Sequence, residues 1–217
     1  MIQYMVVYNV YRYKERVWLN MKYILASASP RRKEILENLG LDFTVITSEA
    51  DEQSEIREPE ALTTELAKRK GQAVANLLLG KGKLDDDTVI ISADTVVFCD
   101  GEILGKPRDK ADAERMIKML SGKAHTVTSG VALIYRGKTV SAASTTEVVF
   151  DTLTDEFIEE YISSSEPYDK AGGYAIQGKA APVISKINGC YFSVVGLPVN
   201  CLCKLAAENE IPLVFNK

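Results

Sequence analysis

The centre of this sequence is the run Thr88-Val89-Ile90-Ile91-Ser92-Ala93-Asp94-Thr95-Val96-Val97-Phe98, which is apolar almost throughout and rich in valine and isoleucine. Such a run predicts a central strand that is buried on both faces. Asp94 breaks the pattern, because a carboxylate in a buried strand is strongly disfavoured unless a divalent cation, a lysine or a water to be deprotonated lies beside it. Two interpretations of Asp94 stay open here: a functional acid, or a strand-end aspartate that contacts water or makes structural hydrogen bonds. Lys106, just after the next turn, is a candidate partner for it.

Helical and strand-like patterns alternate on both sides of this run, and two turns set how some of the strands connect. Asp100-Gly101 and Gly137 are hairpin signals, which place neighbouring strands antiparallel. Alternating helices and strands with hairpins among them predict an α/β fold whose sheet is mixed rather than wholly parallel. The predicted strands are 22–26, 43–47, 88–98, 102–104, 125–135, 139–150 and 191–195, and the predicted helices are 30–39, 61–79, 109–120, 154–163 and 198–208.

The composition is that of a globular protein. The 217 residues carry a net charge of −4, and 46% of them are hydrophobic and 26% charged. Residues 21–217 are predicted to form a single domain. The acidic charge speaks against a dedicated nucleic-acid binder, which normally has a basic stripe. No apolar run reaches the roughly 18 residues that insertion into a membrane requires.

The first 20 residues look unlike the rest. They run from apolar to basic, which is the reverse of a signal peptide, and Met21 stands directly before the first predicted strand. We therefore expect translation to start at Met21 and residues 1–20 to be an atypical extension.

Four cysteines and one histidine limit the metal chemistry of the chain. The spacing of Cys99, Cys190, Cys201 and Cys203 matches neither a disulfide framework nor a zinc knuckle, so we expect reduced thiols in a cytoplasmic protein. His125 alone cannot build a histidine-rich site. Any metal is therefore expected to be held by carboxylates and phosphate oxygens, which suits Mg²⁺ or Mn²⁺.

The turn Ser27-Ala28-Ser29-Pro30-Arg31-Arg32 joins the first predicted strand to the first predicted helix. Serine at the cap and proline at the first helical position are a strong helix start signal. The two arginines stand at the positive end of the helix dipole, where carboxylates are preferred. They are explained if a phosphate binds between the free amides, the serine hydroxyl and a guanidinium. A capped helix whose arginines extend into solvent remains the alternative.

The segment 169–178 is a glycine-rich loop with a lysine and, near its end, Gln177. Glycines allow the backbone to come close to a ligand, and an amide offers the paired donor and acceptor that read a base edge. The spacing matches neither the P-loop nor the dinucleotide fingerprint, so an ordinary flexible turn stays open as well.

Together these motifs resemble the Maf family of nucleoside triphosphate pyrophosphatases, from about Lys22 to the C-terminal helix. One departure is Gly71, where the family more often has alanine and where glycine lowers helix propensity by roughly 1 kcal/mol. The resemblance implies an elongated mixed α/β sheet with flanking helices and two lobes around a central cleft, similar to inosine triphosphate pyrophosphatases, and a homodimer. The matching segments are residues 25–32, 51–52, 66–70, 93–97, 105–107, 169–178 and 187–198.

The resemblance also implies an activity, the hydrolysis of a nucleoside triphosphate to the monophosphate and pyrophosphate with a divalent metal. Asp94 would accept the proton of the attacking water, and Glu52 with Asp94 would hold the metal. The phosphate-binding residues would be Ser27, Arg32, Lys70 and Lys106. Base preference would be set by Arg31, Thr95 and Gln177, whose identities match the branch acting on dTTP and UTP rather than on 7-methyl-GTP.

A second function class is a non-catalytic nucleotide or nucleic-acid binding regulator of cell division that uses the same cleft. The acidic net charge and the presence of Asp94 and Glu52 favour the enzyme. Metal-dependent release of pyrophosphate distinguishes the two classes.

Overall fold

The structure is a computed structural model that describes residues 21–47 and 49–215, so the expectation for residues 1–20 lies outside the described residues. From β1 to α5 (residues 22–162), its strands and helices follow the predicted order with small shifts at the ends. The elements are β1 (Lys22–Leu25), α2 (Pro30–Asn38), β2 (Phe43–Val45), α3 (Pro59–Gly80), β3 (Thr88–Cys99), β4 (Glu102–Leu104), α4 (Lys110–Leu120), β5 (Ala124–Tyr135), β6 (Lys138–Phe150), α5 (Asp155–Ile162), the 3₁₀ turns η1 (Pro167–Asp169), η2 (Ala171–Gly173) and η3 (Ala181–Val183), β7 (Ile184–Asn188), α6 (Tyr191–Val195) and α7 (Val199–Glu208).

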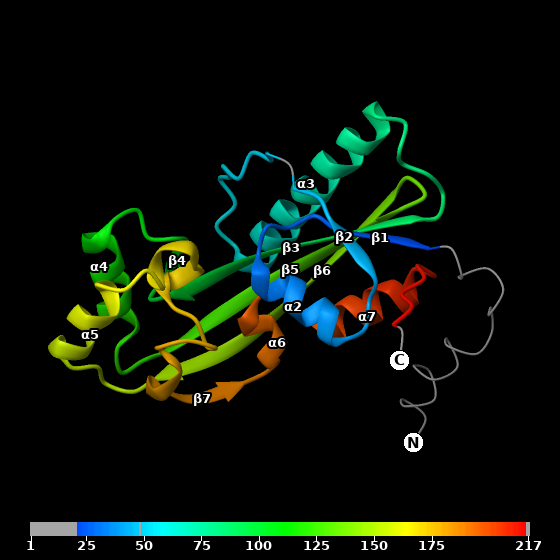
Figure 1. Ribbon diagram of the computed structural model, residues 1–217. Coiled ribbons are helices and arrows are strands. Elements are labelled where there is room, and N and C mark those ends of the chain that lie inside the picture. Colours follow the sequence, from blue (N-terminus) through cyan, green and yellow to red (C-terminus); the bar gives the residue numbers. More distant parts are fainter. Residues whose placement is uncertain (1–20, 48, 216–217) are drawn as a thin grey trace, which may run out of the picture.

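One mixed sheet organises the molecule, as the sequence predicts. Its strand order is β2-β1-β3-β5-β6-β7, and β4 pairs with β3. The strand β1 is parallel to both β2 and β3, whereas β3, β5, β6 and β7 pair antiparallel in turn. The long strands β3, β5 and β6 run through the whole molecule in Figure 1, with α3 on one side of them and α2, α6 and α7 on the other.

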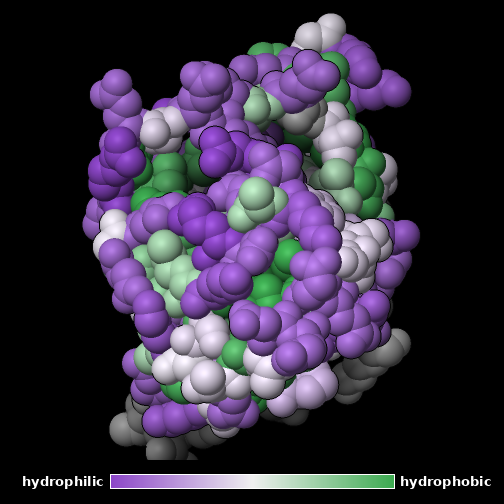
Figure 2. Space-filling view, turned by 90° about the vertical axis from the view of Figure 1, so that its left-hand side faces the viewer, coloured by the Kyte–Doolittle hydropathy of each residue, from purple (hydrophilic) through white to green (hydrophobic). Residues whose placement is uncertain are grey.

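Two separate hydrophobic cores lie toward the two ends of these long strands, which produces the predicted two lobes. One core joins β1, α2 and α7 and includes the fully buried Leu25, Leu36 and Leu202. The other joins β4, α4 and α5 around residues such as Leu104 and Ile117. In Figure 2 the end of the molecule that carries α4 and α5 is mainly hydrophilic, with apolar residues visible between the polar ones.

Helix α3 packs unusually close to β3 because Gly71 has no side chain. A Cβ at this position would lie 2.7 Å from Ser92 Oγ, and that hydroxyl donates to the carbonyl of Ala67 across 2.7 Å. Gly71 lowers the helix propensity of α3, but the close contact between α3 and β3 requires it. This contact sets the position of Lys70, the preceding residue.

The C-terminal region differs from the prediction in two ways. Residues 191–195, predicted as a strand, form the short helix α6, which ends at Gly196 with a φ of 120°. The last strand of the sheet is instead β7, which lies at its edge beside β6 and which the sequence did not predict. A bulge in β7 explains the omission. Ile184 pairs with Phe150 and Ile187 pairs with Val148, so β7 has one more residue between these two pairs than β6 has. The bulge therefore breaks the alternation by which a strand is recognised.

Two further findings concern the chain as a whole. All four cysteines are free thiols. Within residues 21–47 and 49–215, no helix combines the length and the hydropathy that crossing a membrane requires.

Candidate active site

A gap along one edge of β3 forms the site. On this edge β1 pairs with β3 only as far as Ile91, and β4 begins its pairing at Val97. Among the described strands, none pairs with the β3 residues between these points on this edge, and Asp94 and Thr95 lie there. This position explains how a carboxylate can stand in a central strand: the neighbouring strand has ended, and a cleft of about 720 Å³ replaces it. Asp94 is nevertheless only 7% exposed.

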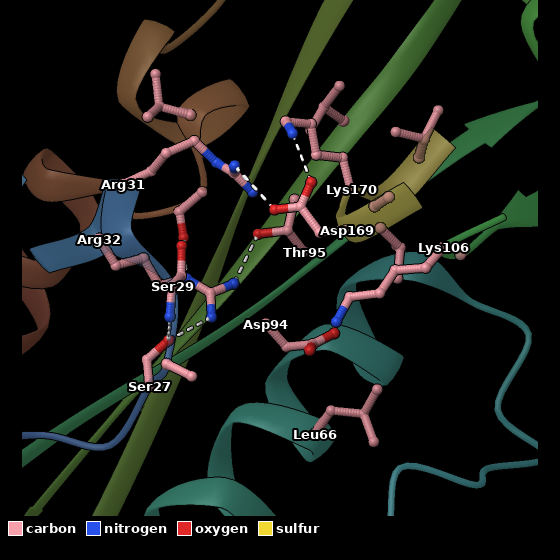
Figure 3. Close-up of a pocket in the computed structure, with 18 of the residues that line it drawn as sticks. Ser27, Ser29, Arg31, Arg32, Leu66, Asp94, Thr95, Lys106, Asp169 and Lys170 are labelled. Atoms are coloured by element: carbon pink, nitrogen blue, oxygen red, sulfur yellow. Dashed lines mark hydrogen bonds and ion pairs between the residues drawn. The ribbon is translucent and has the colours of Figure 1, made fainter. Parts of the chain in front are cut away.

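Lys70 of α3 is the cation that pairs with Asp94. Its Nζ lies 2.6 Å from Asp94 Oδ1 and 3.0 Å from Glu52 Oε1, so one ammonium joins two carboxylates from a strand and a loop. The partner of Asp94 is thus Lys70 rather than Lys106, the candidate from sequence. Lys106 lines the same cleft, and Figure 3 shows its side chain extending into it on the side of Asp94.

The residues around Asp94 fit a divalent cation of the magnesium type. The described residues contain no cluster of three or more histidine, cysteine, aspartate or glutamate side chains that could enclose a metal by themselves. Magnesium needs only one or two carboxylates, because waters and substrate phosphates supply its other ligands. Asp94 and Glu52 already converge on one positive charge, the ammonium of Lys70. They are therefore suited to share a second cation between them and a bound triphosphate.

Arg32 is a half-buried cation whose partners are neutral. Its Nε donates to the carbonyl of Gly196 at 2.8 Å, Nη1 to Ser27 Oγ at 3.0 Å and Nη2 to Thr95 Oγ1 at 3.2 Å. Within the described residues no carboxylate lies at ion-pair distance from this guanidinium. Burial lowers the pKa of Arg32, and the charge of Asp94 offsets only part of this effect. A charge that is partly removed from water and has no counter-ion is unfavourable, so the position favours binding of an anion in the cleft.

The hydroxyl of Ser27 is ready to donate to such an anion. Its oxygen accepts hydrogen bonds from Ser29 N at 3.2 Å and from Arg32 Nη1, which occupies both lone pairs. The hydroxyl proton therefore remains for an acceptor in the cleft. Ser29 is the N-cap residue of α2 but its side chain makes no capping hydrogen bond, and the first turn has no acidic residue. The free amides of α2 thus face the same space, which is the arrangement that binds phosphate.

Arg31 has a different role from Arg32. It leaves α2 toward the loop after α5, where its Nη1 lies 3.6 Å from Asp169 Oδ2 (Figure 3). Burial would raise the pKa of Asp169, but a hydrogen bond from Lys170 and the charges of Lys170 and Arg31 outweigh it, so that pKa lies below its ordinary value. The ion pair joins two walls of the cleft that are far apart in sequence.

Gln177 is the predicted site residue that the structure does not bring to the others. It is exposed and is absent from the lining of the cleft, although Ala175 and Ile176 beside it contribute to that lining. The glycines of this loop also serve a purpose other than the predicted one. Gly172 has a φ of 69°, and a Cβ there would lie 2.7 Å from Val97 Cγ2. The loop therefore needs glycine to pack against β3, rather than to admit a ligand.

Several residues that take part in the site were not individually predicted, although Asp169 and Lys170 belong to the predicted loop 169–178. Lys170 and Asp169 line the cleft, the carbonyl of Gly196 holds Arg32, and Ser129 of β5 holds the hydroxyl of Thr95 at 2.7 Å. A backbone carbonyl carries no signal in the sequence, and a serine within a β-rich run resembles any other strand residue. Only the register that places Thr95 opposite Ser129 reveals this pair.

Comparison with known proteins finds relatives over most of this chain. The family model described as "Maf-like protein" matches residues 22–209. A dTTP/UTP pyrophosphatase of Thermococcus onnurineus is 47% identical over 182 residues, which cover 84% of this chain and 95% of that protein. A dTTP/UTP pyrophosphatase of Bacillus anthracis is 46% identical over 184 residues, 84% of this chain and 93% of that protein.

Among solved structures, that of the Staphylococcus aureus Ham1 protein aligns with 87% of this chain and 99% of its own at 13% identity, with a TM-score of 0.49. The family model covers residues 22–209, which include every element that forms the cleft, and the two relatives each match over 84% of this chain. This protein therefore belongs to the Maf family.

Proposed function

We propose that this protein is a pyrophosphatase that hydrolyses dTTP and UTP to the monophosphate and pyrophosphate. The observation that carries the proposal is Asp94, which lies in the gap of the sheet with the ammonium of Lys70 at 2.6 Å. The half-buried guanidinium of Arg32, which has no carboxylate partner among the described residues, lines the same cleft. The relatives that are 46–47% identical bear the name of this activity.

The reaction adds water across the phosphoanhydride bond between the α and β phosphates. The chain supplies a base for the attacking water and cations for the leaving group. Asp94 takes a proton from the water as its oxygen bonds to phosphorus. Lys70, Lys106 and Arg32 balance the negative charge that grows on the departing pyrophosphate. Ser27 donates its free proton to a phosphate oxygen. A divalent cation held by Asp94 and Glu52 would neutralise phosphate charge and acidify a water.

Base selection belongs to the wall of the cleft that carries Arg31 and Thr95. Arg31 offers donors to base carbonyls, and Thr95 lines the cleft next to Arg32. We include Gln177 in the proposal, although a change in the loop 169–178 would have to bring it to the base. The protein is further proposed to act in the cytoplasm, which agrees with its free cysteines, and as a homodimer.

The decisive measurement is pyrophosphate release by the Asp94→Asn variant. We expect kcat to fall by at least about a thousandfold, because asparagine cannot accept the proton. Asp112→Asn is the matched control, since Asp112 is equally buried at 6% exposure but lies in α4 outside the cleft. That variant should lose stability and keep its turnover.

A screen of natural triphosphates with Mg²⁺ and with Mn²⁺ tests the substrate. Hydrolysis of dTTP and UTP above all purine nucleotides is expected. Near-normal turnover by Asp94→Asn would falsify the role of this residue, and a preference for a purine would refute the assignment of the substrate. Nucleotide binding without any hydrolysis would favour a regulatory protein instead.

A further inference from the structure

A chain of hydroxyl groups behind the cleft fixes the direction of one hydrogen bond inside it. Ser129 Oγ donates to the carbonyl oxygen of Ser193 across 2.7 Å, and it lies 2.7 Å from Thr95 Oγ1. A carbonyl only accepts, so the single proton of Ser129 is committed to Ser193. In the pair between Thr95 and Ser129, Thr95 must therefore be the donor.

The same reasoning leaves Thr95 with nothing to donate to a ligand. Its proton goes to Ser129, and one of its two lone pairs accepts from Arg32 Nη2 at 3.2 Å. One lone pair remains. Since Thr95 lines the cleft, the group it presents to a ligand is an acceptor only.

Ser27 and Thr95, both bound to Arg32, thus have opposite polarity. Ser27 has two occupied lone pairs and a free proton, which suits a phosphate oxygen. Thr95 has a committed proton and a free lone pair, which would repel a phosphate oxygen and attract an N–H group. Uracil and thymine carry such a group at N3, whereas N3 of cytosine is an acceptor.

We propose that Ser129 is a positioning residue that makes Thr95 an obligatory acceptor, and that Thr95 thereby selects the N3–H of uracil and thymine over cytosine. The inference rests on the proposed function for its choice of ligand. Ser129 itself is fully buried and is not part of the cleft lining, so it acts only through Thr95.

The test is the affinity of the Ser129→Ala variant for nucleotides that cannot be hydrolysed. Without Ser129 the hydroxyl of Thr95 can turn and donate to N3 of cytosine. We expect the ratio of the Kd of α,β-methylene-CTP to that of α,β-methylene-UTP to fall about tenfold, the equivalent of one neutral hydrogen bond. Titration calorimetry measures this ratio whether or not the protein hydrolyses UTP. Failure of the proposed function would appear separately, as absence of pyrophosphate release from UTP by the unaltered protein.

Thr128→Val is the matched control, because Thr128 is the residue before Ser129 in β5, is 1% exposed and pairs its hydroxyl with that of Thr145. This variant removes a buried hydroxyl from the same strand without changing the hydrogen bonds of Thr95. The ratio of the two Kd values should therefore stay unchanged. A purely structural effect of Ser129→Ala would weaken both analogues equally and leave the ratio as it was, and that result would overturn the proposal.

A second measurement needs no variant and covers the case in which Ser129→Ala does not fold. With α,β-methylene analogues, the unaltered protein should bind 5-methyl-UTP but lose its affinity for 3-methyl-UTP, which has the added methyl group in place of the N3 proton. Removal of the 3′-hydroxyl should leave the affinity unchanged. Equal binding of the two methylated nucleotides, or a large loss with the 3′-deoxy nucleotide, would contradict the assignment of N3–H as the donor to Thr95.

Discussion

Substitution of Gly71 by alanine tests whether close packing or helix propensity decides the stability of α3. Propensity alone predicts that Gly71→Ala stabilises the protein by about 1 kcal/mol. The structure predicts the opposite sign, because the new Cβ would lie 2.7 Å from Ser92 Oγ and 3.1 Å from Ile134 Cδ1. The methyl end of Ile134 can move, but Ser92 is fully buried and its hydroxyl is bonded to the carbonyl of Ala67.

The change in the free energy of unfolding can be estimated from the contacts that the new Cβ would displace. Turning Ser92 away breaks a buried hydrogen bond, which costs about 1–3 kcal/mol, and moving α3 off β3 costs a similar amount. After subtraction of the propensity gain, Gly71→Ala should destabilise the protein by about 1 kcal/mol. This corresponds to a fall in Tm of about 2–4 °C for a chain of this size.

Ser92→Ala makes the test sharper. When the hydroxyl is absent, the nearest atom of residue 92 is its Cβ, at 3.5 Å from the new methyl group, which is ordinary contact. In that background Gly71→Ala should stabilise by up to about 1 kcal/mol. The double-mutant cycle, measured by urea denaturation, should therefore give a coupling of about 2 kcal/mol with a reversal of sign. Equal stabilisation by Gly71→Ala in both backgrounds would refute the packing argument.

Two other substitutions probe ionisable groups, one in the core and one in the cleft. Burial lowers the pKa of His125 to about 4, so the folded chain keeps it neutral while the unfolded chain binds a proton below about 6.5. Stability should consequently fall by about 3 kcal/mol as the pH drops from 6.5 to 4, and His125→Phe should flatten this slope in urea titrations; an unchanged slope would contradict it. Asp169→Asn releases Arg31 from its carboxylate and removes a negative charge from the cleft. The KM for the triphosphate should fall several-fold at low salt with kcat little changed, and a rise in KM would show that Asp169 instead holds Arg31 in its binding position.

Much of the sheet could be predicted from local patterns, because its strands are long and their turns are explicit. The hairpin of β5 and β6 turns at Arg136 and Gly137, which both have positive φ values of 49° and 74°. The run 88–98 is buried as predicted, except for the half-buried Thr95 and Phe98. These features depend on the residues themselves and on their nearest neighbours along the chain.

The errors arose where tertiary contacts outweigh local propensity. Residues 191–195 carry aromatic and β-branched side chains that favour a strand. In the structure Ser193 is fully buried and donates to the carbonyl of Ser144 on β6, and Gly196 ends the helix. The last strand of the sheet is instead β7. Without the register of β6, neither outcome can be derived from the sequence.

At the site, too, the residue types indicated the chemistry, whereas the positions of the side chains depended on tertiary structure. Two arginines at the positive end of a helix predicted an anion, but nothing in the sequence distinguishes Arg31 from Arg32. The distinction arises because α2 directs Arg32 inward, to Ser27 and Thr95, and Arg31 outward, to Asp169. The sequence likewise predicted that Asp94 needs a partner, without revealing that β1 ends at Leu25 and leaves the edge of β3 open beside it. Because that gap depends on the relative lengths of β1 and β3, lengthening β1 through the turn at residues 26–29 should close the site even if every charged residue remains.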